Sequence, residues 1–525
     1  SCPFMASASI LGEADAAGRA SGPAGLLCAR PLRTPLIILA VVVMLRAFGT
    51  VDADVAWQLW IGRQLNHGAQ LYRDIIEANP PLWFWMAVPV DRLSDLVHLR
   101  SDHVLILLIG SAAALSIVAT DRLIGPISDA RRTVLLVYAS LVLVAMPWLE
   151  FGQREHIALI GALPYAALIA ARRAGRPVSA RLAAAIGVGA ALGFALKHYF
   201  LIVPALLELW LIAMLGTKWR PIRAETVAVG AAGSLYAVAL LIGAHDYLTN
   251  VVPMLLLAYG ATGAKRLVDL FQPAVLTALL CMALVLPNRR LLRSEGSALP
   301  AALVIAASGF TIAYFVQAKG WSYHALPMLG CSAMALAAVL VAGSSRSRLT
   351  ILVAPALLLL PFTIAAQQAL RESQIDKDVA HAVQGMRAGD AVGFISPDPS
   401  FGWQVIPEQG FRFAIRYDGF WMMQAIVTNE LRGGADPRLT QLGQRVVRET
   451  VQDFECTPPR RIIVKRPDPV AAQRGEFDIL AFFLRDPQFA SLLAHYGPTE
   501  RTSVEVFELV APLGPPSSCP SWSPV

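Results

Sequence analysis

The sequence predicts a mainly α-helical protein that crosses a membrane many times and carries a small α/β domain near its C-terminal end. Of its 525 residues, 56% are hydrophobic and only 15% are charged, whereas soluble domains contain about 25% charged residues. Apolar runs near or above the ~17-residue lower limit for a membrane-spanning helix recur along the first 370 residues. Beyond them, short β-type runs alternate with helical ones, which is typical of an α/β domain.

We expect eleven of the apolar runs to span the membrane. Lys and Arg gather in alternate loops between the runs, and the positive-inside rule places such loops in the cytoplasm. This places the N-terminus on the inner side of a bacterial cytoplasmic (inner) membrane and the C-terminal region on its outer side. The runs are 34–50, 103–120, 133–149, 157–171, 181–196, 199–215, 223–243, 268–287, 299–316, 323–342 and 349–367.

One further apolar segment, residues 80–97, is predicted to lie at the membrane surface. If it spanned the membrane, every Arg-rich loop would face outward, against the positive-inside rule. Its Trp83, Phe84 and Trp85 also suit an interfacial helix.

The stretch 181–215 is too long for one span and carries a charge at its centre. Lys197 and His198 stand there, and a charged side chain is costly inside a bilayer. The stretch therefore predicts two helices that meet at an external turn.

The predicted domains follow from these patterns. Residues 1–33 form a disordered cytoplasmic tail without a cleavable signal peptide. Residues 34–370 form the transmembrane domain with an external loop at 51–102, residues 371–511 form the extracytoplasmic α/β domain, and residues 512–525 form a Pro/Ser-rich tail.

Within the α/β domain, strands are expected at 391–395, 461–464 and 503–509, and helices at 374–387, 420–431, 439–454 and 477–493. Cys456 and Cys519 both fall in this C-terminal region, so outside the cytoplasm they could form a disulfide.

Polar residues suited to chemistry gather in the external loops of this topology. The first loop carries Asp52, Asp54, Glu77 and Asn79 among aromatic residues, and the second reads Glu-Phe-Gly-Gln-Arg-Glu-His at 150–156. Later loops carry Lys197 with His198, and Lys319 with His324. Carboxylates can deprotonate an acceptor hydroxyl, and cations can hold a phosphate leaving group. The set predicts transfer of a phosphate-linked group.

Other partners are not indicated by the sequence. The excess of Lys and Arg lies in loops that set the orientation of the chain in the membrane. It therefore gives no reason to expect a nucleic-acid partner. No two of His156, His198 and His324 have a metal-ligand spacing on one helix. The sequence identifies no cofactor with certainty, and a divalent metal is left open without being indicated.

Four short motifs of the first loop resemble the GT-C glycosyltransferases, above all the bacterial branch related to protein O-mannosyltransferases and the aminoarabinose transferase of lipid A. They are Asp-Ala-Asp-Val-Ala-Trp at 52–57, Gln-Leu-Asn-His-Gly at 64–68, Leu-Tyr-Arg-Asp at 71–74 and Asn-Pro-Pro-Leu at 79–82. A later segment at 319–327 is similar but less diagnostic, and the resemblance covers about residues 34–370. The sequence has Asp-x-Asp where the family has Asp-Glu.

The resemblance implies an inverting, polyprenyl-phosphate-sugar-dependent glycosyltransferase with an external active site. Its first-loop base corresponds to Asp54, with Asp52 as the second choice. The second acidic position falls on Glu150 or Glu155, and we prefer Glu155.

The remaining site residues are chosen by side of the membrane and by charge. Candidate ligands of the donor phosphate are Arg154, Lys197, Lys319 and His324, and candidate substrate-binding residues are Tyr72, Glu77, Asn79, Trp321 and Tyr323. Expected partners are the lipid-linked donor, membrane lipid, and a lipid, glycan or protein acceptor.

Two other functions compete with this hypothesis. A transporter or flippase for a lipid-linked sugar would place polar groups near the bilayer midplane in repeated halves, and no repeat is visible here. A scaffold or sensor would bind a ligand through the C-terminal domain, for which Arg416, Asp418 and Trp421 are candidates.

Overall fold

A computed structural model describes residues 30–49, 51–262, 266–288, 298–343, 348–372, 377–398, 400–403, 405–417, 419–466, 477–514, 519 and 524. The chain divides into two compact units. Unit 1 comprises residues 1–49, 106–234 and 265–367, and unit 2 comprises residues 50–105, 235–264 and 368–525. The first loop and the C-terminal region therefore belong to the same unit.

Each of the eleven predicted apolar runs contains a helix. These helices are α2 (Arg30–Arg46), α5 (Ser101–Leu123), α6 (Asp129–Val144), α7 (Arg154–Arg173), α8 (Ala180–Ala195), α9 (Ile202–Leu215), α10 (Ala224–Gly243), α12 (Pro273–Val285), α14 (Ala298–Gln317), α15 (Leu326–Val341) and α16 (Arg348–Glu372). Six segments of the described chain are helical, long and apolar enough to cross a membrane, and they include α5, α10, α14 and α16. The count of eleven spans stays a prediction.

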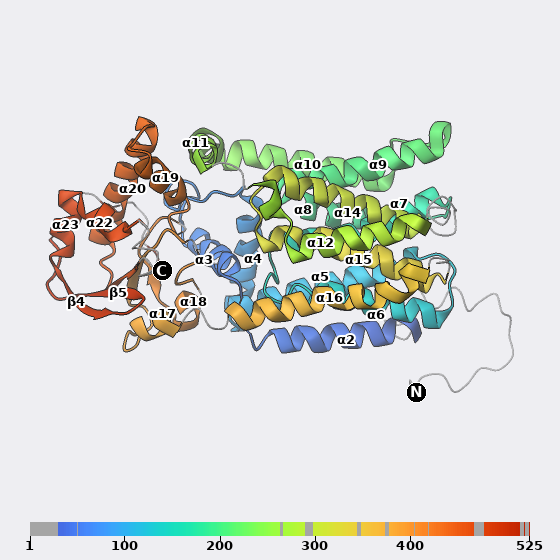
Figure 1. Ribbon diagram of the computed structural model, residues 1–525, viewed down its shortest axis with the longest axis horizontal. Helices are drawn as coiled ribbons and strands as arrows, with labels where there is room; N and C mark the ends of the chain where they lie inside the picture. The colour runs from blue at the N-terminus through green and yellow to red at the C-terminus, as the bar shows by residue number, and fades with distance from the viewer. Residues whose placement is uncertain are drawn as a thin grey trace. The chain divides into compact units, whose positions relative to one another are not determined.

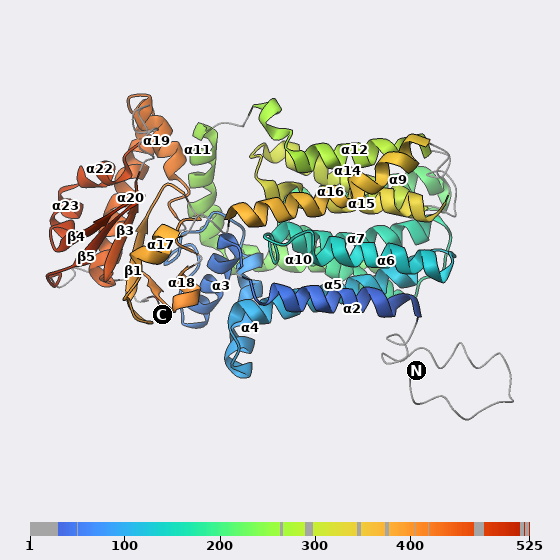
Figure 2. The same ribbon diagram turned by 60° about the horizontal axis from the view of Figure 1, so that its bottom comes forward.

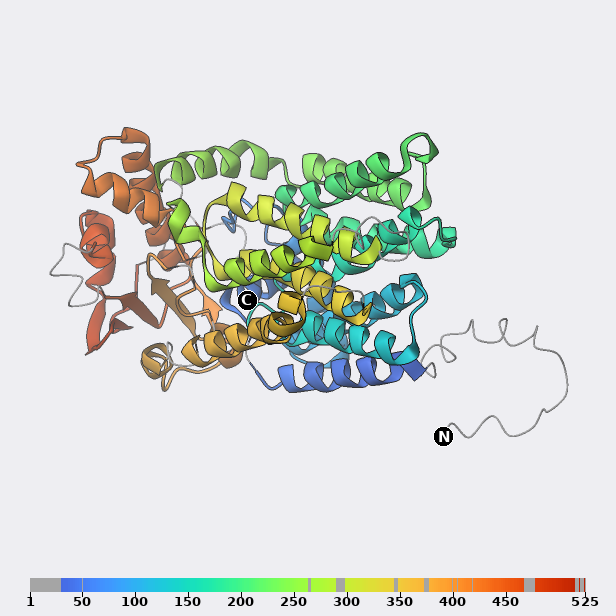
Figure 3. The same ribbon diagram turned by 45° about the vertical axis from the view of Figure 1, so that its right-hand side comes forward.

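The helices of unit 1 lie side by side, as Figures 1 and 3 show for α6, α7, α14 and α15. Small residues allow the closest approach. A Cβ added to Gly161 of α7 would lie 2.9 Å from the carbonyl oxygen of Gly189 in α8. Close backbone contact of this kind is how apolar helices gain packing energy where no hydrophobic effect drives them together.

The predicted break within 181–215 is confirmed. Helix α8 ends at Ala195, a 3₁₀ turn covers His198–Leu201, and α9 begins at Ile202. Lys197 has an extended backbone at this joint, which carries its ammonium out of the helical path.

Unit 2 contains the helices of the first loop, α3 (Ala53–Asn66) and α4 (Leu82–Val97), and also α11 (Val252–Thr262). Helix α4 confirms that residues 80–97 are helical. Helices α3 and α4 touch at Gly62, whose added Cβ would lie 2.7 Å from the Cβ of Ala87.

The C-terminal part of unit 2 is a five-stranded mixed sheet with helices, as predicted for an α/β domain. The strands β1 (Ala391–Ile395), β2 (Arg412–Phe413), β3 (Arg461–Lys465), β4 (Tyr496–Arg501) and β5 (Val504–Leu509) have the order β2-β1-β3-β5-β4. Strand β1 is parallel to β2 and β3, and β5 is antiparallel to β3 and β4. Figure 2 shows β3, β4 and β5 side by side.

The helices of this domain are α17 (Lys377–Ala382), α18 (Val405–Gln409), α19 (Met423–Leu431), α20 (Pro437–Cys456), α22 (Ile479–Leu484) and α23 (Pro487–Leu493). Helix α20 starts where the Asp436 side chain accepts the Arg438 N–H, an N-cap followed by proline in the first turn. It buries one apolar face that includes Leu439, Val446 and Phe454.

Four details differ from the sequence expectations. The expected helix 477–493 is two helices, because Asp486 caps a new helix whose first turn contains Pro487. The short strands β2 and β4 were not expected, since two residues or a run with Gly and Pro give little strand signal. Among the described residues 377–387, the helical part is α17, and α2 begins at Arg30, inside the predicted tail. The rest of that tail lies outside the described residues.

A disulfide joins Cys456 at the end of α20 to Cys519, as the sequence suggested. The bond closes a loop of 63 residues. It attaches the C-terminal tail to the domain, although most of that tail lies outside the described residues.

Candidate functional site

Three of the predicted site residues contact one another in unit 1. They are Glu155, Lys197 and His324, and we call them the Glu155 cluster. The Lys197 ammonium lies 2.5 Å from Glu155 Oε1 and 2.9 Å from His324 Nε2. His324 Nε2 is 3.6 Å from the same carboxylate oxygen. All three side chains are buried. A lysine, a glutamate and a histidine thus share one desolvated contact.

Each member of the Glu155 cluster stands at the start of a helical segment. Glu155 is in the first turn of α7, where the positive end of the helix dipole favours a carboxylate. Lys197 precedes the 3₁₀ turn before α9, and His324 lies in the 3₁₀ turn Ser322–Ala325 before α15. The three segments bring together residues that lie 42 and 127 positions apart.

Further basic and aromatic side chains surround this cluster. The positive charges of Arg154 and Lys319 act on His324 together with that of Lys197. Burial lowers the pKa of Lys319. Tyr323 places its ring 5.5 Å from the Lys197 ammonium, and Trp321 stacks on Tyr323 with 5.7 Å between ring centroids. Arg154, Lys197 and Lys319, the other three predicted phosphate ligands, therefore all lie within electrostatic range of His324.

Sequence reasoning missed Gln317, whose side-chain oxygen lies 3.4 Å from the Lys197 ammonium. Gln317 is the last residue of α14 and stands two residues before Lys319 in the chain, and this position could have identified it as a site residue. The segment 318–320 is tightly bent, since Ala318 and Gly320, on either side of Lys319, have positive φ angles of 50° and 61°. A non-glycine residue in this region is energetically unfavourable, so the surrounding contacts hold the bend in place.

The second group lies in unit 2, and we call Trp57, Tyr72, Glu77 and Asn79 the Glu77 cluster. Trp57 Nε1–H donates to Glu77 Oε2 at 2.5 Å, while the backbone N–H and the Nδ2 of Asn79 both donate to Glu77 Oε1 at 2.7 Å. Glu77 is 1% exposed. These contacts give Glu77 a structural role, and its predicted contact with substrate stays a prediction.

Tyr72 completes this cluster and fixes a strained turn. Its φ angle is +75°, which is rare for a bulky residue. The Tyr72 hydroxyl donates to the Asn79 carbonyl at 2.7 Å, and its backbone N–H donates to the Ile75 carbonyl at 2.7 Å. Burial and the nearby Glu77 carboxylate raise its pKa well above the ordinary value. Tyr72 thus remains a hydrogen-bond donor.

The two aspartates of the first loop have different local surroundings. Asp52 is the N-cap of α3, and its carboxylate accepts the backbone N–H of Asp54 at 2.9 Å. Asp54 lies in the first turn of the same helix, and both residues are partly exposed. A capping role accounts for an acidic residue at position 52. The choice of Asp54 over Asp52 as the reactive carboxylate stays a prediction.

The C-terminal domain packs directly on this loop within unit 2. Trp403 and Phe413 contact Trp57, with ring centroids 4.6 and 6.2 Å away. The Ile76 N–H donates to the Arg416 carbonyl at 2.8 Å. These contacts could not be predicted, because nothing in residues 403–416 specifies a partner more than 300 positions away.

Of the residues considered for a sensor site, Arg416 forms a contact within its own domain. The Arg416 guanidinium forms an ion pair with buried Asp453 at 2.7 Å. Asp418 lies outside the described residues. Among the residues that the structure describes, no group of three or more His, Cys, Asp or Glu side chains could hold a metal ion.

No protein-family profile and no curated protein sequence matches the chain. Five solved chains match it in structure. One is an oligosaccharyltransferase of Archaeoglobus fulgidus with zinc and sulfate, at 12% identity and a TM-score of 0.40, covering 89% of this chain and 71% of that one. Another is the oligosaccharyltransferase AglB of the same archaeon with an inhibitory peptide and a dolichol-phosphate, at 10% identity and a TM-score of 0.41, covering 89% and 72%. Because both TM-scores are below 0.5, we base the functional proposal on the residues of this chain.

Proposed function

We propose that this chain is a GT-C-type membrane glycosyltransferase. It transfers a sugar, with inversion, from a polyprenyl-phosphate donor to a lipid, glycan or protein acceptor on the extracytoplasmic side of a bacterial inner membrane. The observation that carries the proposal is the contact of Lys197 with Glu155 and His324, together with the charges of Arg154 and Lys319 that act on His324. All four basic residues are candidate phosphate ligands by sequence.

The chemistry of the Glu155 cluster suits a phosphate that leaves. In the transfer, an acceptor oxygen forms a bond to the anomeric carbon while the bond from that carbon to the phosphate oxygen breaks. Negative charge then grows on the departing polyprenyl phosphate. Arginine and lysine stabilise such charge by charge-assisted hydrogen bonds, and burial strengthens the attraction. Glu155 holds the Lys197 ammonium in position.

Asp54 is the proposed general base of this reaction. It would take the proton of the acceptor hydroxyl as the new glycosidic bond forms. Its neighbour Asp52 caps α3 and serves to hold Asp54 in place. Tyr72, Glu77 and Asn79 keep the loop that carries Asp54 folded, and Trp321 and Tyr323 offer aromatic faces to a sugar.

The disulfide supports the proposed side of the membrane. Cys456 and Cys519 are joined in the domain that charge placed outside, and disulfides persist in oxidising compartments such as the bacterial periplasm.

Mass spectrometry of envelope glycans, glycolipids and glycoproteins tests the proposal. A deletion strain is compared with strains rescued by the wild type, by Asp54→Asn and by Asp52→Asn. One sugar should disappear on deletion and return with the wild type. Asp54→Asn should lower transfer by about 10²- to 10⁴-fold, the usual contribution of a general base. Asp52→Asn is the matched control, since asparagine also caps a helix.

The lost sugar and its carrier would name the donor and the acceptor. If every glycan is unchanged while the protein is present in the membrane of the wild-type strain, the transferase proposal is wrong. A deletion that instead traps a lipid-linked sugar on the cytoplasmic side would establish the flippase hypothesis in its place.

A further inference from the structure

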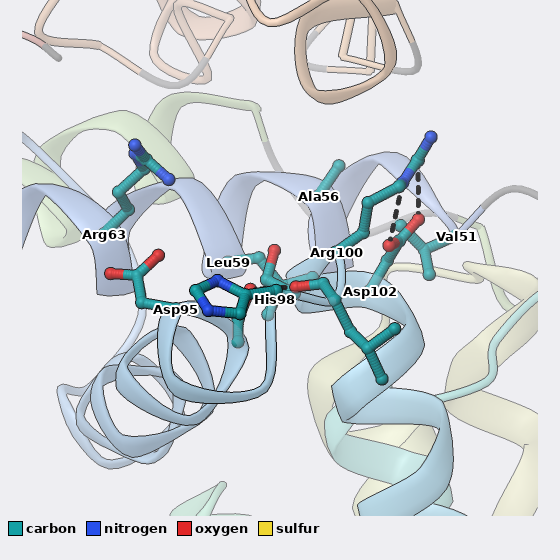
Figure 4. A pocket seen from close by; sticks show the side chains of 11 residues that line it. Val51, Ala56, Leu59, Arg63, Asp95, His98, Arg100 and Asp102 are labelled. Atoms are coloured by element: carbon teal, nitrogen blue, oxygen red, sulfur yellow. Dashed lines mark hydrogen bonds and ion pairs between the residues drawn. The ribbon is translucent and has the colours of Figure 1, made fainter.

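A pocket separate from the residues discussed above lies in unit 2, where α4 ends and α5 begins. Its volume is about 450 Å³, which falls within the usual range of small-ligand sites. Buried Ala56 and Leu59 of α3 form part of its apolar floor, and charged side chains stand at its edge. Figure 4 shows Arg63 and Asp95 at one end, the Arg100 and Asp102 pair at the other, and the His98 ring between them.

The pocket faces away from the proposed base. Arg63 follows Asp54 by about two and a half turns of α3, at 3.6 residues per turn. Arg63 and Asp54 therefore lie on opposite sides of the helix. A ligand held in the pocket would be bound at a second site.

The wall formed by residues 94–102 is fixed by its own hydrogen bonds. His98 ends α4 with a left-handed backbone, and its N–H donates to the Ser94 carbonyl. The Ser94 hydroxyl donates to the Leu99 carbonyl at 2.5 Å. Arg100 forms two hydrogen bonds with the Asp102 carboxylate, at 3.1 and 2.7 Å. The pocket is thus formed before any ligand enters.

Its charges are of both signs and only partly matched. Arg100 and Asp102 neutralise each other. Within the described residues, the Arg63 guanidinium and the Asp95 carboxylate have no hydrogen bond or ion pair. An exposed cation and an exposed anion thus remain on one rim, with His98 beside them. This arrangement complements a ligand that carries a negative and a positive group together.

The position along the chain places the pocket at a membrane surface. Ser101 is the first residue of α5, a candidate membrane span, and it lines the pocket. Leu96 and Leu99 beside it are 76% and 46% exposed. Exposed leucines next to charged residues at the start of a span are suited to the boundary between lipid headgroups and acyl chains.

We propose that this pocket binds a phospholipid whose headgroup carries a phosphate and a primary amine, as in phosphatidylethanolamine. Arg63 and His98 receive the phosphate, and Asp95 receives the ammonium. The acyl chains lie along Leu96 and Leu99. The proposal is independent of the glycosyltransferase activity, because it uses none of the residues assigned to that reaction.

Native mass spectrometry of the purified full chain tests the proposal. The protein is delipidated and then exposed to vesicles of phosphatidylethanolamine or of phosphatidylcholine with the same acyl chains. The wild type should retain phosphatidylethanolamine about tenfold better, since a trimethylated amine cannot donate hydrogen bonds to Asp95 and hydrogen bonds between charged groups are stronger than neutral ones. Asp95→Asn should reduce this preference, since a neutral amide oxygen is a weaker acceptor for an ammonium than a carboxylate is. Arg63→Gln should weaken retention of both lipids.

Arg92→Gln is the matched control. Arg92 is an exposed cation on α4, the helix that carries Asp95, and its side chain does not line the pocket. It should leave lipid retention unchanged. All three variants should unfold at the wild-type temperature, since the side chains are on the surface.

Three results would overturn the proposal. They are equal retention of the two lipids by the wild type, an unchanged preference in Asp95→Asn, and binding of soluble phosphoethanolamine as tightly as the lipid. The last result would show that the ligand is a soluble phosphate ester and not a membrane lipid.

Discussion

Glu77 and Glu155, two of the buried glutamates among the described residues, are stabilised in opposite ways. Glu77 accepts hydrogen bonds from neutral groups, the Trp57 indole and the Asn79 amides, all within one loop. Glu155 instead contacts the charged Lys197 and the His324 ring, which come from separate segments. A carboxylate satisfied by neutral local donors organises its own loop. One surrounded by basic groups belongs to a cluster that can also receive a second anion. From this difference we predict that Glu77 is a structural acid and that Glu155 belongs to the proposed phosphate site.

Lys197→Met should have the largest effect. It leaves Glu155 buried without its ammonium partner, and breaking such a pair costs about 3–5 kcal/mol. Thermal unfolding in detergent measures the loss of stability, and retention of polyprenyl phosphate in native mass spectra measures the loss of binding.

The double variant Lys197→Met, Glu155→Gln separates these two effects. It removes both charges, so most of the stability should return while phosphate retention stays low. If phosphate retention recovers along with stability, the cluster is purely structural and the comparison with Glu77 fails.

Trp57→Phe should have the next largest effect on stability. The variant keeps the ring packing on Trp403 and removes one donor to the Glu77 carboxylate, a loss of about 1.5–3 kcal/mol for a hydrogen bond to a charged group. Tyr72→Phe is the comparison, since its hydroxyl donates to a neutral carbonyl and is worth about 0.5–1.5 kcal/mol. Thermal unfolding ranks the two variants. The reverse order would mean that Glu77 is not the centre of its cluster.

Gly62→Ala tests whether the two first-loop helices need their close contact. The added methyl group would lie 2.7 Å from the backbone carbon of Ala87, and overpacking of this kind costs about 1–3 kcal/mol. Gly230→Ala in α10 is the control, because its Cβ meets nothing within 4 Å and alanine raises helix propensity by up to about 1 kcal/mol. Equal unfolding temperatures for both variants would show that α3 and α4 are free to separate.

Lys319→Arg should give the smallest and most specific effect. Burial lowers the pKa of Lys319, so this side chain loses its positive charge at a lower pH than an ordinary lysine. Phosphate retention should therefore weaken as the pH rises toward the ordinary lysine range. Arginine stays charged there, and the variant should move this alkaline decline to higher pH. An identical pH profile would show that Lys319 does not hold the phosphate.

Several features of this protein could be predicted from residues that are close together in the chain. Long apolar runs mark the helices, because a buried backbone must form its hydrogen bonds within the segment. Lys197 and His198 mark the joint between α8 and α9, since charge is costly in a membrane span. The alternating runs after residue 370 mark strands β1, β3 and β5. In each case one local property, apolarity or charge, decides the outcome.

Local signals failed where the outcome depends on a neighbour. Strand β2 has two residues, and its place in the sheet depends on pairing with β1. In the sequence, Trp403 and Phe413 resemble any other core residues. Only the structure shows that the first loop packs on them. The polar rim of Arg63 and Asp95 was also missed, because both look like ordinary surface charges in the sequence.

The sequence by itself thus determined the helices, the α/β character of the C-terminal domain and the set of candidate acids and bases. Only the tertiary structure decided that Glu155 meets Lys197 and His324, and that Glu77 is satisfied by Trp57 and Asn79. The reason is physical. Helix formation depends on contacts within a few residues, whereas the pairing of buried charges depends on how separate helices pack, over separations of 42 and 127 residues for Lys197.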